Sequence, residues 1–119
     1  MTKFSLAMGV GRREPMSSIG GFAEAIERYG FHRIWVQDNP LMTKDAYMTL
    51  TVVALNTTTL SLAPGVSNTL IRHVSVIVNS IATLDQLSEG RAVLGVGMGG
   101  RHARGGDSVI VRCDDGRPS

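Results

Sequence analysis

The fold class follows from residues 59–100, which read TLSLAPGVSNTLIRHVSVIVNSIATLDQLSEGRAVLGVGMGG. Residues 59–63 are a predicted strand that ends in a Pro-Gly turn. Residues 73–87 are a predicted helix, and Gly90 lies where a left-handed residue ends a helix. Residues 92–97 form a continuous apolar run, typical of a strand buried on both faces. Strand, helix and strand in this order predict a βαβ unit with a parallel pair.

The predicted helix has apolar residues at spacings of three and four, which would share one buried stripe. They are Val74, Ile77, Val78, Ile81, Leu84 and Leu87.

The residues before this segment repeat the same alternation. Residues 4–10 and 33–37 are predicted strands, and helices are expected from Ser17 or Ser18 to Tyr29 and from Asp45 to about Asn56. The first helix should point inward through Ile19, Phe22, Ala23, Ile26 and Tyr29. The strands begin near residues 4, 33, 59 and 91, at intervals of 29, 26 and 32 residues. This period predicts a parallel α/β sheet with right-handed crossovers.

Two architectures fit that period. A (β/α)8 barrel needs about 250 residues, so four βα units would be its N-terminal half. A doubly wound open sheet needs only about five strands and would be nearly complete in 119 residues. The period alone does not separate them.

A series of sequence segments carries a family resemblance. In chain order they are a strand that ends in Pro-Gly-Val-Ser-Asn, the pair Arg72-His73, the segment ATLDQLSEGR and the Gly-rich segment GVGMGG. Together they resemble the luciferase-like monooxygenase family, which includes coenzyme F420-dependent reductases. The resemblance implies the barrel. We therefore expect residues 1–100 to be a partial luciferase-like TIM-barrel domain.

Residues 101–119 do not match that pattern. Four arginines crowd this segment, a helix is not evident, and only about 107–111 reads as a short strand. We interpret it as an irregular basic tail, and one hypothesis is a truncated or frame-shifted reading frame. A half barrel would leave strand edges and interior side chains uncovered, so we expect a homodimer or other self-association.

Ligands of parallel α/β proteins bind at the carboxyl ends of the strands. At the end of the second strand the family often carries Asp-His, near the cofactor ring and the substrate. Asp38 matches the first position, and Asn39 replaces the His. Because of this resemblance, Asp38 and Asn39 are both candidate catalytic residues. The replacement of His by Asn39 argues against proton transfer at that position. The alternative is that Asp38-Asn39-Pro40 is only a turn.

The loop after the third strand gives the first group of cofactor-binding candidates. The resemblance implies a non-prolyl cis peptide at Gly65-Val66, which makes a bulge behind the cofactor ring. An ordinary Pro-Gly type II turn is the alternative. Ser67 and Asn68 follow, and their side chains can donate to a ring carbonyl or a phosphate.

The remaining candidates lie at other strand ends. Gly97, Met98 and Gly99 are expected to contact the cofactor, and Gly9 and His73 the substrate. His73 is equally well placed to cap a helix. The segment GVGMGG also satisfies GxGxxG, but a dinucleotide site needs a helix opening at the last Gly and an acidic residue about twenty further on. Residues 101–106 are a poor helix, and the sequence ends nineteen residues after Gly100, so this interpretation is disfavoured.

Composition narrows the function class. The chain is 43% hydrophobic and 18% charged, with a net charge of +2, which indicates a globular protein. One cysteine and three scattered histidines predict no metal site. We see no nucleic-acid-binding motif, signal peptide or membrane span, so a cytoplasmic protein is expected.

The leading interpretation is an oxidoreductase that uses coenzyme F420 or FMN and transfers hydride, or inserts oxygen, on a small organic substrate. One alternative is an inactive half barrel that only dimerises or binds a flavin weakly. Another is a small doubly wound nucleotide-binding module.

Overall fold

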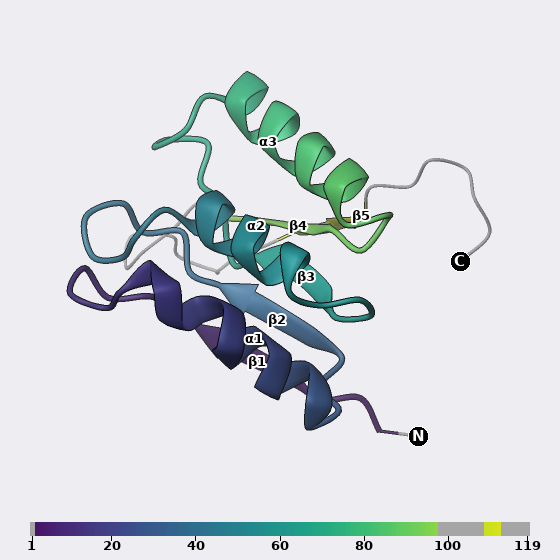
Figure 1. Cartoon of the computed structure of the whole chain (residues 1–119). Helices are drawn as coiled ribbons and strands as arrows, with labels where there is room; N and C mark the ends of the chain where they lie inside the picture. Colours follow the sequence, from purple (N-terminus) through teal and green to yellow (C-terminus); the bar gives the residue numbers. More distant parts are fainter. Residues whose placement is uncertain (1, 98–108, 113–119) are drawn as a thin grey trace.

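The computed structural model describes residues 2–97 and 109–112, and strands and helices alternate along it (Figure 1). The elements in chain order are β1 Ser5–Met8, the 3-10 turn η1 Met16–Ser18, α1 Ile19–Arg28, β2 Arg33–Val36, α2 Ala46–Leu55, β3 Ser61–Pro64, α3 Val74–Leu87, β4 Val93–Val96 and β5 Val109–Arg112. Each strand and helix expected before residue 98 is present, with ends close to those predicted.

The first three strands form a parallel sheet in the order β1-β2-β3. The register pairs Ser5 with Arg33 and Arg33 with Ser61. Because α1 and α2 supply the crossovers, the strands share one direction and their carboxyl ends lie at the same edge.

β4 runs parallel beside β3, but the pairing is interrupted. Bridges join Leu62 to Ala92 and Ser67 to Val96, so the β3 side has one more residue than the β4 side between them. The extra residue makes a β-bulge. Pro64 lies inside the bulge and has no N–H to donate to a neighbouring strand. The chain therefore leaves the regular ladder at the end of β3.

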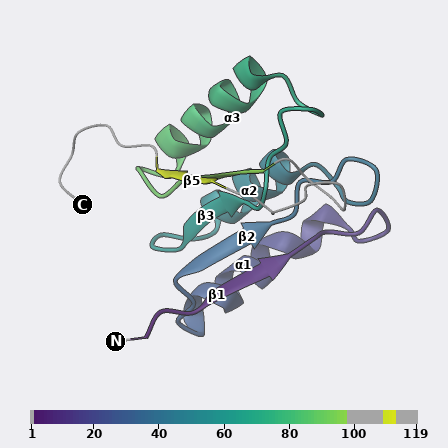
Figure 2. The same cartoon turned by 180° about the vertical axis from the view of Figure 1, so that it is seen from behind.

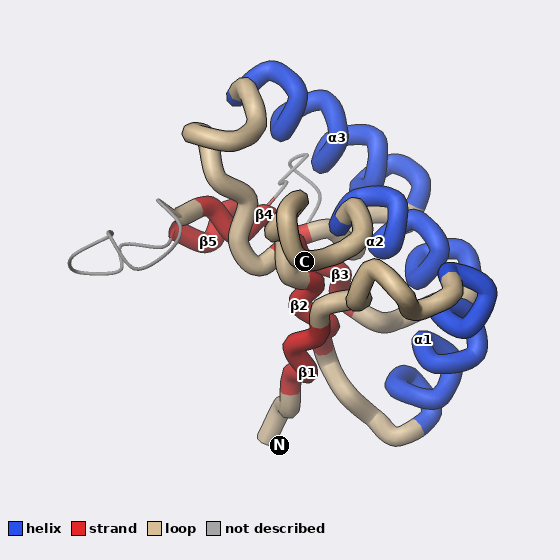
Figure 3. Tube along the Cα trace, turned by 90° about the vertical axis from the view of Figure 1, so that its left-hand side faces the viewer, coloured by secondary structure: helices blue, strands red, loops and turns tan. Residues whose placement is uncertain are grey.

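The three helices cover a single face of the sheet (Figures 1 and 3). Seen from behind, β1 and β2 carry no helix of the described chain on their other face (Figure 2). A doubly wound sheet has helices on both faces, so this arrangement favours the barrel. The core lies between sheet and helices and includes Ile34, Val36, Leu62 and Leu94 from the strands and Ala23, Ile26, Leu50, Val53, Ile77 and Ile81 from the helices.

The buried stripes are narrower than predicted. In α3, Ile77, Ile81 and Leu84 are buried, whereas Val74 and Val78 are each 55% exposed. Helix α3 thus meets the sheet along one line of residues, and positions beside that line face outward. The prediction was also wrong for Leu87, Phe22 and Tyr29, which are exposed.

β4 is buried on both faces as expected, since the successive residues Val93 and Leu94 point to opposite sides and are both buried. Its second neighbour is β5, which pairs antiparallel, with Val93 opposite Arg112 and Val96 opposite Val109. This departs from the parallel repeat. The other residues of the segment 101–119 lie outside the described residues, so its interpretation as a tail stays a prediction.

Polar contacts close the edge opposite the strand carboxyl ends. Glu27 of α1 accepts the backbone N–H groups of Thr58, Thr59 and Leu60 with its Oε2, at 2.9, 2.8 and 3.0 Å. Burial opposes the charge of Glu27, but these donors outweigh it and lower the pKa of Glu27 below its ordinary value.

Arg91 makes the second polar junction at this edge. Its guanidinium donates to the carbonyl oxygens of Ala54, Thr57 and Leu60, at 2.9, 3.1 and 3.0 Å, and to Thr57 Oγ1 at 2.8 Å. It thereby ties the end of α2 to the start of β4, because the carbonyls at a helix end have no partner within the helix.

Candidate functional site

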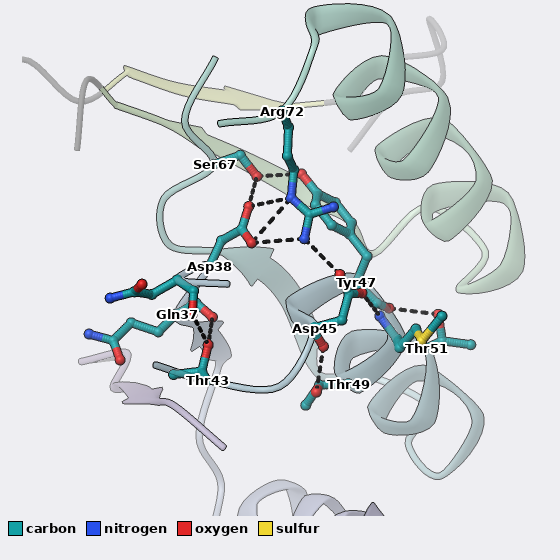
Figure 4. A network of polar contacts seen from close by, with 11 residues as sticks. Gln37, Asp38, Thr43, Asp45, Tyr47, Thr49, Thr51, Ser67 and Arg72 are labelled. Atoms are coloured by element: carbon teal, nitrogen blue, oxygen red, sulfur yellow. Dashed lines mark hydrogen bonds and ion pairs between the residues drawn. The ribbon is translucent and has the colours of Figure 1, made fainter. Parts of the chain in front are cut away.

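A cluster of polar side chains lies where the strands end (Figure 4). Asp38 follows β2, Ser67 follows β3, and Arg72 precedes α3. Asp45 is the N-cap of α2 and Tyr47 lies in its first turn. The parallel topology brings these five residues to one edge, which is where α/β proteins bind their ligands.

Arg72 is the cation of the cluster. Its Nε lies 2.9 Å from Asp38 Oδ2 and its Nη2 lies 3.0 Å from Asp38 Oδ1, a two-point ion pair. The same Nη2 donates to Asp45 Oδ1 at 2.7 Å. The guanidinium also stacks over the Tyr47 ring, 5.0 Å from its centroid. We call Arg72 with Asp38 and Asp45 the Arg72 clamp.

The two ends of the clamp stabilise each other's charge. The hydrogen bonds that Arg72 donates to Asp38 raise the pKa of Arg72 most strongly, against the effect of burial, so the guanidinium stays protonated. Burial would raise the pKa of Asp45, but the Arg72 hydrogen bond and the N–H of Met48 outweigh it and lower that pKa. The Met48 N–H donates to Asp45 Oδ2 at 2.8 Å, which is the N-cap contact of α2.

The hydroxyl groups of Tyr47 and Ser67 and the carboxylate of Asp38 form a chain of hydrogen bonds that all point in one direction. A carboxylate only accepts hydrogen bonds, so Ser67 Oγ donates to Asp38 Oδ2, at 3.2 Å. Because the Ser67 hydroxyl donates its only proton to this hydrogen bond, it cannot also donate to Tyr47. The Tyr47 hydroxyl must therefore donate to Ser67 Oγ. Burial raises the pKa of Tyr47 above its ordinary value, so the phenol keeps the proton that it donates.

Of the two catalytic candidates, only Asp38 belongs to this cluster. Its side chain is 3% exposed. Asn39 is exposed, and its backbone carbonyl accepts from the N–H groups of Met42 and Thr43 in a turn. A turn is thus present at residues 39–43, one residue beyond the start of the turn predicted at Asp38-Asn39-Pro40. Asp38 is not its hydrogen-bonding residue, because its side chain binds Ser67 and Arg72 instead.

Ser67 is completely buried, and its polar groups are engaged within the protein. Its N–H donates to Gly95 O at 2.7 Å, and its carbonyl accepts from Gly97 N at 3.0 Å. Because its hydroxyl donates a hydrogen bond to Asp38, Ser67 has no free hydroxyl proton to donate to a ligand in this arrangement. Its contact with a cofactor stays a prediction.

Asn68 shapes the loop that returns to Arg72. Its Oδ1 accepts from Leu70 N at 2.8 Å, and its carbonyl accepts from Arg72 N at 2.9 Å. This arrangement is a side-chain turn followed by a backbone turn. We call residues 67–72 the site loop.

The peptide bond between Gly65 and Val66 is cis, as the family resemblance implied, and the type II turn is not formed. A β-carbon on Gly65 would lie 2.9 Å from Trp35 Cε3. The Trp35 ring therefore fills the space beside this bulge. Whether Gly65 and Val66 also contact a cofactor stays a prediction.

The remaining candidates are separate from the cluster. A β-carbon on Gly9 would lie 2.6 Å from Gln37 Oε1, so Gly9 packs against the residues after β2. His73 is the N-cap of α3, and its Nδ1 accepts from Ser75 N at 3.1 Å, which is the capping alternative. Gly97 contributes the N–H that binds Ser67, while Met98 and Gly99 lie outside the described residues.

Arg72, Asp45 and Tyr47 were not predicted as site residues. The sequence feature that could have indicated Arg72 and Asp45 is an arginine and two aspartates in loops that follow different strands of one parallel sheet. In the sequence, Arg72 indicates only the family resemblance, and Asp45 indicates only the start of a helix.

Neither a metal site nor a membrane-spanning helix is found among the described residues. No group of three or more His, Cys, Asp or Glu is placed to hold a metal ion there. In the same part of the chain, every helix is too short or too polar to cross a membrane.

Comparison with known proteins identifies relatives. The sequence model of the family described as luciferase-like monooxygenase matches residues 1–109. A 5,10-methylenetetrahydromethanopterin reductase from Methanolobus tindarius is 38% identical over 86 residues, which are 72% of this chain and 26% of that protein.

Solved structures give the same result. A coenzyme F420-dependent tetrahydromethanopterin reductase from Methanopyrus kandleri superposes with a TM-score of 0.76 at 30% identity, over 82% of this chain and 27% of that one. The oxygenating constituent of 3,6-diketocamphane monooxygenase from Pseudomonas putida, in complex with FMN, has a TM-score of 0.72 at 18% identity and shares the fold, over 83% of this chain and 30% of that one.

The chain thus spans about a quarter of the length of these reductases, and it corresponds to the N-terminal βα units of their barrel. The fold predicted from the sequence is confirmed. Since the family model covers most of the sequence, the chain belongs to the luciferase-like monooxygenase family.

Proposed function

We propose that this chain forms the strand-end part of a cofactor site in an oxidoreductase that uses coenzyme F420 or FMN. The observation that carries the proposal is the buried cluster of Asp38, Ser67 and Arg72 at the carboxyl ends of β2 and β3. A polar cluster at that edge is where a barrel enzyme of this family would build its site.

The residues present suit the ring of such a cofactor better than its phosphate. The bulge at the end of β3 places Gly65 and Val66, which are half-buried, beside the polar cluster. Phosphate recognition needs an available cation or an open helix N-terminus. Arg72 is already paired with two carboxylates, and His73 caps α3. We therefore assign the backbone of Gly65 and Val66, with Asn68 and Gly97, to the ring.

When bound, the cofactor would supply hydride transfer, or oxygen insertion if it is a reduced flavin that reacts with O2. The chain itself would bind the ring, orient it and keep water from one side of it. Of the two cofactors, F420 is favoured, because the two relatives at 38% and 30% identity described above are named as a methylenetetrahydromethanopterin reductase and as an F420-dependent reductase. A reduced pterin is accordingly the first substrate class to try among small organic molecules. The proposal retains the cytoplasmic location expected from the sequence.

The test is a titration of the purified chain with oxidised F420 and with FMN, followed by ring fluorescence. We expect saturable binding of F420 in the micromolar range and weaker binding of FMN. NAD⁺ is the control ligand, since the GxGxxG interpretation requires it to bind. Absence of saturable binding by either ring cofactor would contradict the proposal.

A second candidate is a chain that self-associates without turnover. It is favoured by the uncovered face of β1 and β2, where Ser5 and Ala7 are exposed. Sedimentation velocity would test it. A dimer that binds neither cofactor would support this candidate over the enzyme.

A further inference from the structure

We propose that Arg72 is a positioning residue that fixes the site loop to the end of β2, and that Asp38 serves this clamp instead of transferring protons. The proposal deepens the function proposed above and rests on it for the identity of the ligand. It reassigns the role that the family resemblance implied for Asp38.

Asp38 has little capacity left for chemistry. Its Oδ1 accepts from Arg72 Nη2, and its Oδ2 accepts from Arg72 Nε and from Ser67 Oγ. With 3% of its side chain exposed, it cannot approach a substrate atom without breaking the ion pair. A general acid or base must reach the proton that it moves, directly or through one water. The geometry instead suits a fixed anion that orients its neighbours.

Arg72 joins three parts of the chain that are distant in sequence. Its side chain holds Asp38 after β2 and Asp45 at the start of α2, and it covers the Tyr47 ring. Its backbone N–H closes the site loop on Asn68 O. Because Asp38 and Asp45 accept from the same Nη2, removal of the guanidinium would leave two carboxylates close together without a counter-charge.

The clamp also controls the junction with β4. Asp38 accepts a hydrogen bond from the Ser67 hydroxyl, and the backbone of Ser67 is hydrogen-bonded to Gly95 and Gly97. A fixed Ser67 therefore keeps the bulge in place between the two strands. Loss of the clamp should loosen this junction while β1 and β2 stay paired, since their contacts do not involve Arg72.

The first measurement is amide hydrogen exchange at Ser67 and Gly97 in the whole chain, with Gln37 N, which donates to Met8 O, as the internal reference. In Arg72→Met we expect exchange at Ser67 and Gly97 to accelerate at least about tenfold and Gln37 to change much less. Arg72→Lys keeps the charge but loses the planar fork, so it should be intermediate. Unchanged exchange at Ser67 and Gly97 in Arg72→Met would overturn the clamp.

If Arg72→Met does not fold, Asp45→Asn replaces it, because Asn still caps α2 while the ion pair is lost. The single tryptophan, Trp35, lies against Gly65 and gives one indole N–H signal in NMR that reports on the bulge. We expect this signal to shift in Asp45→Asn and in Arg72→Lys. An identical indole signal and identical exchange in both variants would overturn the proposal.

Asp38→Asn separates the two roles of Asp38. For a positioning residue, F420 affinity should fall about tenfold or more and Ser67 should exchange faster. An amide is uncharged and has one acceptor oxygen, so it cannot replace both of the carboxylate oxygens that Arg72 contacts. For a proton-transfer residue, affinity and exchange should match the unmodified chain, and that result would overturn the inference. If the unmodified chain binds neither F420 nor FMN, the proposed function fails, while the exchange data still decide whether the clamp exists.

Discussion

Gly95 and Pro64 approach each other so closely that a β-carbon on residue 95 would lie 2.7 Å from the carbonyl oxygen of Pro64. The same β-carbon would lie 3.1 Å from Trp35 Cζ3. A backbone oxygen cannot rotate away as the end of a side chain can. Gly95 is thus required by the packing of β4 against the bulge, independently of any ligand.

We therefore expect Gly95→Ala to lower the free energy of unfolding by about 2 kcal/mol or more. Gly21→Ala is the matched control, because nothing lies within 4 Å of a β-carbon there and Ala favours the helix by up to about 1 kcal/mol. Urea denaturation of both variants checks this. Equal stability of Gly95→Ala and the unmodified chain would mean that β4 is not held against Pro64.

Glu27 should make stability depend on acid pH. Its folded-state pKa is lowered, so its contribution is present above the unfolded value, near 4.5, and is lost as pH falls through the folded value. We expect Glu27→Gln to cost about 1–2 kcal/mol at pH 7, because a neutral amide accepts three N–H groups less well. Urea midpoints from pH 7 to 3 should converge for the two proteins. Glu24→Gln, at an exposed site on α1, should have little effect, and a pH-independent difference for Glu27→Gln would contradict the argument.

Arg91 should be sensitive even to replacement by lysine. Burial lowers the pKa of Arg91, yet its guanidinium donates to three backbone carbonyls at the end of α2 and the start of β3. A lysine nitrogen cannot reach this set, so we expect Arg91→Lys to cost about 1–3 kcal/mol. Arg28→Lys in α1 is the control at an exposed site. Thermal unfolding followed by circular dichroism measures both, and equal losses would show that the carbonyl contacts of Arg91 add nothing.

The alternation of strands and helices could be predicted because it depends on local pattern. Residues 73–97 show the change from a helical to a continuous apolar pattern within one segment, and the structure places α3 and β4 there. Burial was harder to predict. Val74 and Val78 share the spacing of Ile77 and Ile81, and only the packing of α3 against the sheet decides which residues are covered.

The candidate site was predicted by position and not by contacts. Asp38 was identified because it ends a strand, but its partner Arg72 is 34 residues away and no motif spacing links them. The hydrogen bond from the Ser67 hydroxyl to Asp38 depends on the orientation of both side chains, which the local sequence does not determine. The sequence Pro-Gly-Val fits a type II turn as well as a cis bond, and the resemblance alone suggested the cis bond.

Tyr47 offers a direct test of the hydroxyl chain. Burial, helped by the nearby charges of Asp38 and Asp45, outweighs the hydrogen bond with Ser67 and raises the pKa of Tyr47. The folded state therefore holds the phenol proton more tightly than the unfolded state, so this stabilisation is present below about pH 10 and is lost as pH rises through the folded value.

We expect Tyr47→Phe to cost about 1 kcal/mol at pH 7, because Ser67 Oγ loses its donor while the ring remains under Arg72. Absorbance titration of the unmodified chain and of Tyr47→Phe gives the Tyr47 step by difference, with the exposed Tyr29→Phe as control. A Tyr47 step at or below pH 10, with no loss of stability in Tyr47→Phe, would show that the phenol faces water and that the chain from Tyr47 through Ser67 to Asp38 is not formed.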